Sequence, residues 1–68
     1  MAAKVTLAGA RVSSNMTQEQ LAEKMGVSRA TVVDWETGKR EMRTVYLHLF
    51  CLITGFAEDE ILLPVKST

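Results

Sequence analysis

The residues with the most versatile chemistry are the single histidine and the single cysteine, His48 and Cys51, which lie three positions apart in an apolar stretch. On a helix this spacing would allow both side chains to contact one metal ion. Two ligands are too few, however, because a closed zinc site has four. Catalysis needs a nucleophile with an oriented base or paired carboxylates in a pocket, and Cys51 is the sole plausible partner of His48. We therefore interpret both as packing residues and predict no metal site, no cofactor and no enzymatic activity.

A second set of side chains, in the segment SRATVVDWE, has the types that contact DNA. If this segment is a helix with Val32 and Trp35 inward, an arginine, an alanine and an aspartate point outward. Arginine makes two hydrogen bonds to guanine, alanine touches the thymine methyl group, and aspartate accepts from cytosine N4. The residues on or beside this outward face, which we predict to contact bases, are Ser28, Arg29, Ala30, Thr31 and Asp34. In an alternative role, Asp34 solvates this face or repels wrong sequences.

Short helices must position these residues, and capping residues and turn residues divide the chain into five of them. Thr17 and Gln20 have the spacing of a capping box, in which each side chain bonds the other residue's backbone N–H. Asn15 tolerates the left-handed conformation that ends a helix. The five expected helices begin near Val5, Thr17, Ser28, Thr44 and Glu58 and end near Asn15, Gly26, Gly38, Gly55 and Pro64.

The fourth segment, TVYLHLFCLITG, is ambiguous because its aromatic and β-branched residues also suit a strand. A lone strand would have no partner in a chain whose other segments are helical. We interpret the segment as a helix that Thr44 caps and Gly55 closes. The apolar residues that recur at helical spacing in it and just beyond it are Val45, Leu49, Leu52, Ile53 and Phe56.

The second and third segments together have the pattern of a helix-turn-helix unit over residues 17–37. Two helices that cross near 90–120° need a small residue at their closest approach, a glycine in the turn and apolar facing sides. Ala22 is the small residue, and Gly26 supplies the turn. The apolar positions are Leu21, Met25, Val27, Val32 and Trp35.

The stretch TQEQLAEKMGVSRATVVDWETGKR resembles the Cro and phage-repressor type of helix-turn-helix domain, also called the xenobiotic-response-element family. The resemblance extends over about residues 4–64 and implies an all-α, five-helix, lambda-repressor-like fold. It also implies an ion pair between Arg11 and Glu36 that ties the first helix to the third. Three features depart from the family pattern: the loop lacks a proline at Met42-Arg43, Ala57 replaces a capping serine or threonine, and the fourth helix is unusually apolar.

Contacts to the DNA backbone come partly from the resemblance and partly from position. By resemblance, Gln18 at the start of the second helix binds a phosphate, which that helix's N-terminal dipole favours. Lys39, Arg40 and Arg43 flank the recognition helix and are predicted to contact phosphates as well. In an alternative interpretation, Lys39 and Arg40 belong to an ordinary solvated loop.

The fourth helix is apolar almost all round, so one small core cannot cover every side of it. We expect the extra cover to come from a second chain, with Tyr46, Leu47 and Phe50 near the interface of a two-fold homodimer. Such a dimer would hold two recognition helices about 34 Å apart, as a pseudo-palindromic operator requires.

Length and charge limit the classes of protein that fit. Sixty-eight residues predict a single domain, 1–68, whose small core leaves no room for a deep substrate cleft. The longest apolar stretch, residues 45–53, is well short of the roughly 20 residues of a membrane span. A lone cysteine fits a reducing compartment. The net charge is zero, yet residues 1–43 have seven basic and five acidic side chains and residues 44–68 have one and three.

The leading functional prediction is a sequence-specific transcriptional regulator of the Cro or repressor type, from a bacterium or a phage. Its expected partners are a double-stranded DNA operator and a second copy of the chain, with no membrane and no small-molecule substrate. The expected location is the cytoplasm, at the nucleoid. The alternative is a small helix-turn-helix modulator or antirepressor that acts by binding another regulator protein, which the neutral charge and the apolar fourth helix favour.

Overall fold

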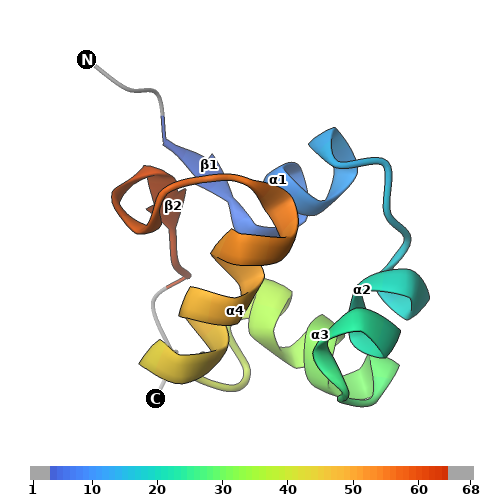
Figure 1. The fold of residues 1–68 in the computed structure, drawn as a ribbon. Coiled ribbons are helices and arrows are strands. Elements are labelled where there is room, and N and C mark those ends of the chain that lie inside the picture. The colour runs from blue at the N-terminus through green and yellow to red at the C-terminus, as the bar shows by residue number, and fades with distance from the viewer. Residues whose placement is uncertain (1–3, 65–68) are drawn as a thin grey trace.

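The computed structural model describes residues 4–64. Figure 1 shows α2 and α3 together on one side, α4 beside α3, and β1 and β2 next to each other on the other side. The elements in chain order are β1 (Val5–Thr6), α1 (Leu7–Ser13), α2 (Gln18–Met25), α3 (Arg29–Thr37), α4 (Thr44–Thr54), the 3-10 helix η1 (Glu58–Glu60) and β2 (Ile61–Leu62). No helix within these residues is long and apolar enough to cross a membrane.

The expectation of five helices in an all-α fold is wrong at both ends of the described chain. The last segment makes only the single turn η1 and then continues as β2, which pairs in parallel with β1. Val5 lies opposite Ile61 and Thr6 lies opposite Leu62. Three residues are too few to propagate a helix, and Ala57 offers no side-chain oxygen to cap one. The chain therefore has four α-helices between residues 4 and 64.

Capping residues set the bounds of the first three helices. The Thr6 hydroxyl accepts from the Gly9 N–H at 3.0 Å, so α1 begins at Leu7 rather than near Val5. The capping box of α2 is confirmed, because the Thr17 hydroxyl accepts from the Gln20 N–H at 3.0 Å and the Gln20 side chain accepts from the Thr17 N–H at 2.9 Å. Asn15 has φ +59°, the left-handed conformation expected of it.

The fourth segment is a helix, as expected, but its start and its buried face differ from the expectations. Arg43 is the N-cap of α4 and Thr44 is its first residue, so the expectation that Thr44 caps this helix is wrong. Of the residues at helical spacing, Leu49, Ile53 and Phe56 are half-buried against the core, whereas Val45 and Leu52 are 69% and 70% exposed. Phe50 is fully buried instead.

The hydrophobic core lies where the four helices and β2 meet. Phe50 packs there inside its own chain, so the expectation that it lies near an interface with a second chain has to be corrected. Tyr46 and Leu47 are half-buried against the same core. The buried residues are Leu7, Ala10, Leu21, Ala22, Met25, Val32, Trp35, Met42, Phe50, Cys51 and Ile61.

Candidate nucleic-acid interface

The α2–turn–α3 unit has the internal packing that a helix-turn-helix needs. Gly26 ends α2 with φ +71°, and the Val27 N–H then donates to the Ala22 carbonyl at 3.0 Å. Ala22 is buried between the helices. On α3 the side chains of Val32 and Trp35 are buried, so the opposite side of this helix faces outward. The helix-turn-helix prediction for this part of the chain is confirmed.

The outward side of α3 presents the residues that we expect to contact bases. Ser28, Arg29 and Ala30 are exposed, whereas Thr31 and Asp34 are half-buried. The Ser28 hydroxyl caps α3 by accepting from the Thr31 N–H at 3.2 Å, and the two hydroxyl groups lie 3.0 Å apart. Arg29 therefore stands at the exposed first position of a capped helix, where its guanidinium can extend into a groove.

A cluster of polar side chains joins α1, α2 and α3 through Glu36. The Arg11 guanidinium donates to both carboxylate oxygens of Glu36, with Nε to Oε2 at 2.7 Å and Nη2 to Oε1 at 3.4 Å. The Arg11 and Glu36 side chains are 13% and 8% exposed, so the ion pair is largely shielded from water. Arg11 Nη1 also donates to the Met16 carbonyl at 2.9 Å. The pair inferred from the family resemblance is present and ties α1 to the end of α3.

Gln18 also belongs to this cluster, which its position in the sequence did not predict. Its Nε2 donates to Glu36 Oε1 at 3.0 Å. The amide has a second N–H and a carbonyl oxygen, so a phosphate contact at the start of α2 remains open to it. Gln18 and Glu36 are 18 positions apart, so no local pattern predicts their contact. The sequence could have indicated it only through the expected closeness of the start of α2 and the end of α3.

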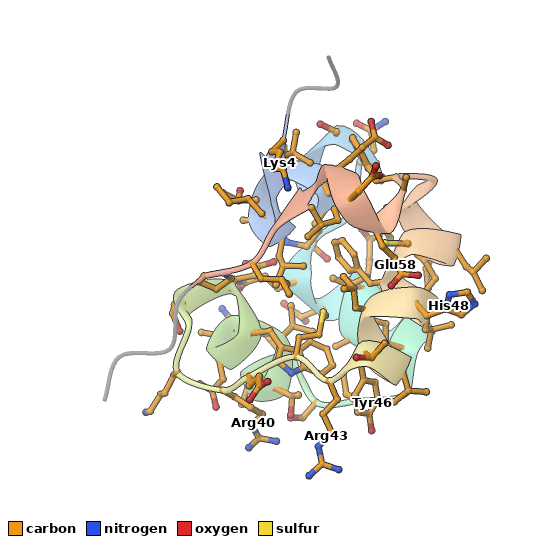
Figure 2. All side chains as sticks on the ribbon, turned by 90° about the vertical axis from the view of Figure 1, so that its left-hand side faces the viewer. Lys4, Arg40, Arg43, Tyr46, His48 and Glu58 are labelled. Atoms are coloured by element: carbon orange, nitrogen blue, oxygen red, sulfur yellow. The ribbon has the colours of Figure 1, made fainter. Side chains whose placement is uncertain are left out.

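A cleft of about 600 Å³ lies beside the N-terminal half of α3, between that helix and the start of α4. Trp35 and Tyr46 both line it, with their ring centroids 5.2 Å apart. In Figure 2, Arg40 and Arg43 project from one edge of the molecule, with Tyr46 close by. The cleft is lined by Val27, Ser28, Thr31, Trp35, Arg40, Glu41, Arg43 and Tyr46. Two guanidinium groups, one carboxylate, two hydroxyl groups and a phenol thus gather next to the recognition helix.

The loop between α3 and α4 is held in place without the proline of the family pattern. The Arg40 N–H donates to the Asp34 carbonyl at 3.1 Å, which fastens the loop to the end of α3. Met42 is buried in the core and anchors the middle of the loop. Lys39, Arg40 and Arg43 are all exposed. The loop is therefore fixed by its backbone and by Met42, and its cations point to solvent.

The start of α4 differs from the starts of the other three helices. Hydroxyl groups of Thr6, Thr17 and Ser28 cap α1, α2 and α3, whereas no side-chain oxygen caps α4 at Arg43. Helix N-termini carry N–H groups without an intrahelical acceptor and a partial positive charge. This end of α4 lies at the Arg43 edge of the cleft and adds to its positive potential.

His48 and Cys51 occupy different environments. Cys51 is buried, as expected, and burial raises the pKa of its thiol, with smaller contributions from Glu58 and Glu60. His48 is exposed, so the expectation that it packs in the core is wrong; its Nδ1 lies 3.3 Å from Glu58 Oε2. Within residues 4–64 no group of three or more histidine, cysteine, aspartate or glutamate side chains could hold a metal ion.

A comparison with known protein families finds a match. A family model described as helix-turn-helix matches residues 7–46, which is 40 of the 68 residues. The matched region runs from the start of α1 into the first turn of α4 and contains the Arg11–Glu36 pair and every residue that lines the cleft. Searches of curated proteins and of solved structures found no match.

Proposed function

Because this chain belongs to the Cro and phage-repressor type of helix-turn-helix family, whose members are DNA-binding regulators, we propose that it reads a specific operator by placing α3 in the major groove. The observation that carries this proposal is the exposed start of α3, where Arg29 stands free of internal packing. The proposed base contacts are made by Ser28, Arg29, Ala30, Thr31 and Asp34. The proposed role is repression, through binding rather than catalysis, in the cytoplasm at the nucleoid.

Phosphate contacts on both sides of α3 fix the position of this helix on the duplex. On one side, Gln18 uses the amide N–H that Glu36 leaves free, at the positive end of α2. On the other side, Arg40 and Arg43 at the edge of the cleft, together with Lys39 in the same loop, bind the backbone. The uncapped start of α4 supports the same contacts.

Two copies of the chain bind one operator in this proposal. A single α3 covers too few base pairs for a specific site, and helix-turn-helix dimers place two recognition helices about one turn of DNA apart. A pseudo-palindromic operator with half-sites about 34 Å apart follows from the two-fold symmetry. Tyr46 and Leu47 remain candidates for the contact between copies, because both are only half-buried.

A second candidate function is that of a modulator that acts by binding another regulator protein. The exposed apolar side chains of α4 favour it, since an exposed apolar patch marks an interaction site. The zero net charge favours it as well, because non-specific DNA affinity depends on positive charge.

Selection of bound sequences from a random pool of duplex DNA, repeated at two salt concentrations, tests the proposal. We expect an enriched palindrome and weaker binding at the higher salt concentration. A variant with Lys24→Ala, which removes a charge from the exposed side of α2, is the control and should select the same palindrome. Absence of enrichment at both salt concentrations would favour the modulator instead.

A further inference from the structure

The outermost face of α4 is apolar, although that is the side on which a surface helix usually carries polar residues. Val45 and Leu52 are 69% and 70% exposed, and Leu49 between them is half-buried. These residues are spaced i, i+4 and i+7, so at 100° per residue they fall within a sector of about 60°. We call them the α4 stripe. Phe50 and Cys51, on the other side of the helix, are buried.

Packing within the chain accounts for only one residue of the α4 stripe, because Leu49 is half-buried against the core whereas Val45 and Leu52 are mostly exposed. Single exposed apolar residues are normal on a protein surface and need no explanation. A continuous row on one helix is the pattern by which a partner helix is bound, with apolar anchors at i, i+3 or i+4, and i+7. The stripe therefore has the geometry of a helix-docking surface.

The border of the α4 stripe is acidic. His48 lies next to the stripe on the surface of α4. Its Nδ1 is 3.3 Å from Glu58 Oε2, so η1 also lies beside the stripe. Glu58 and Asp59 are exposed and Glu60 is half-buried. Residues 44–64 contain no lysine or arginine. A partner that covers the stripe consequently meets carboxylates and, apart from the His48 imidazole that contacts Glu58, no basic side chain of residues 44–64.

The acidic border and the DNA-facing cations lie on different parts of the surface. In Figure 2, His48 and Glu58 project on one side, while Arg40 and Arg43 project from the lower edge. A cationic partner attracted to the acidic border would therefore lie on a different side of the molecule from Arg40 and Arg43.

We propose that the α4 stripe docks an amphipathic helix of another protein whose apolar positions are flanked by lysine or arginine. The charges beside the α4 stripe favour this partner over a second copy. A second copy would bring its own Glu58, Asp59 and Glu60 to the contact and no lysine or arginine from residues 44–64, and its Arg43 lines the cleft at the start of α4. The stripe is about 10 Å long at 1.5 Å per residue, which places the contact in the small, transient class of interfaces. The inference does not depend on DNA binding.

Titration of the full chain with three synthetic helical peptides of equal length, followed by amide NMR shifts, tests this proposal. The first peptide has leucine at i, i+4 and i+7 with flanking lysines. The second replaces the lysines by glutamates, and the third keeps the lysines and replaces the leucines by glutamines. We expect saturable shifts in α4 and η1 with the first peptide alone, with affinity that falls as salt is added.

Variants of the chain connect the shifts to the stripe and to its border. Leu52→Gln, or Val45→Gln as an independent second variant, should weaken binding at least tenfold, and Glu58→Gln with Asp59→Asn several-fold. The matched control is Val12→Gln, because Val12 is an equally aliphatic, 60% exposed residue on α1, and it should bind as the unmodified chain does.

Three results would overturn the proposal. Equal binding of the glutamate-flanked peptide would exclude charge selection, and unchanged binding by Leu52→Gln would exclude the stripe. A concentration-dependent dimer in sedimentation that Leu52→Gln abolishes would show that a second copy covers this face. DNA binding by Leu52→Gln, measured in parallel, should be unchanged, so the outcome is separate from that of the operator selection.

Discussion

At the scale of single residues, Glu36 organises the polar contacts behind the DNA-facing surface. It accepts from Arg11 on α1 and from Gln18 on α2 while it belongs to α3. One carboxylate thus joins three helices in a site that is largely shielded from water. A buried carboxylate with its donors in place is stable, whereas the same group without them has a high desolvation cost. The orientation of α3 relative to Gln18 consequently depends on this residue.

Replacing Arg11 by methionine should lower the free energy of unfolding by about 3 kcal/mol, because it leaves the Glu36 carboxylate without its main partner. Urea denaturation measures the loss. The double variant Arg11→Met with Glu36→Met should recover much of it, since no unpaired charge is then left inside. Losses that simply add in the double variant would show that the two residues act independently.

Replacing Arg29 by alanine should cost about 1–3 kcal/mol of operator affinity and relax the base preference at one position of each half-site. Competition binding with single-base operator variants detects both effects. Lys24→Ala provides the control for loss of a positive charge. An equal loss of affinity on operator and on random DNA would instead assign Arg29 to the phosphate backbone.

The raised pKa of Cys51 predicts a pH dependence of stability. Burial disfavours the thiolate in the folded chain, so the folded state retains the proton to higher pH than the unfolded state does. The stabilising contribution is therefore complete below the ordinary pKa of 9.0 and is lost as pH rises through the folded-state pKa. Urea denaturation from pH 7 to pH 10.5 should show a steeper decline for the unmodified chain than for Cys51→Ala. Parallel declines would contradict this assignment.

At the scale of elements, the residue at the start of α4 suits DNA binding better than it suits helix stability. An N-cap oxygen stabilises a helix, and α1, α2 and α3 each have one. α4 has Arg43 at this position, where the guanidinium projects to solvent at the edge of the cleft. The helix therefore lacks a stabilising cap at the end that we expect to face a phosphate.

Replacing Arg43 by serine should raise the free energy of unfolding by about 0.5–1 kcal/mol and weaken DNA binding at the same time. The loss of one phosphate contact should reduce the slope of binding against salt by about 1. Arg43→Ala is the matched control, because it removes the same charge without adding a cap, and should weaken binding without the gain in stability. A serine variant that binds DNA as well as the unmodified chain would remove Arg43 from the interface.

At the scale of the whole molecule, zero net charge conceals a separation of charge. The basic excess of residues 1–43 includes the cations around α3, and the acids of η1 lie beside α4. The long-range field of such a molecule attracts DNA weakly, because the two ends partly cancel at a distance. Specific binding then relies on contacts made at close range.

The salt dependence of operator binding should accordingly be modest. Each phosphate neutralised by a cation contributes about −0.9 to the slope of log K against log salt concentration. With Lys39, Arg40 and Arg43 as the cations, we expect a slope of about −3 for one copy and about −5 for two. Filter binding or fluorescence anisotropy at several salt concentrations gives this number. A slope near −10 would mean that many more cations approach the backbone than this surface provides.

Local signals were enough to identify the helix-turn-helix unit and three of the cap positions. The capping box at Thr17, the left-handed turn at Gly26 and the cap at Ser28 each depend on residues within four positions of one another. Such contacts form in much the same way wherever the segment lies, so residue type and spacing predict them. The base-contact candidates follow from them, because two buried positions on α3 define the opposite face.

Only the tertiary structure decided the features that join distant parts of the chain. The α4 sequence is apolar on nearly every side, so periodicity alone could not choose between Phe50 and the α4 stripe as the buried face. The packing of the other helices around α4 buries Phe50 and leaves Val45 and Leu52 exposed. The pairing of Val5 with Ile61, the contact of Gln18 with Glu36 and the meeting of Trp35 with Tyr46 likewise depend on how the helices pack. Local sequence determined the helix-turn-helix unit, and packing decided which residues of α4 remained exposed for a partner.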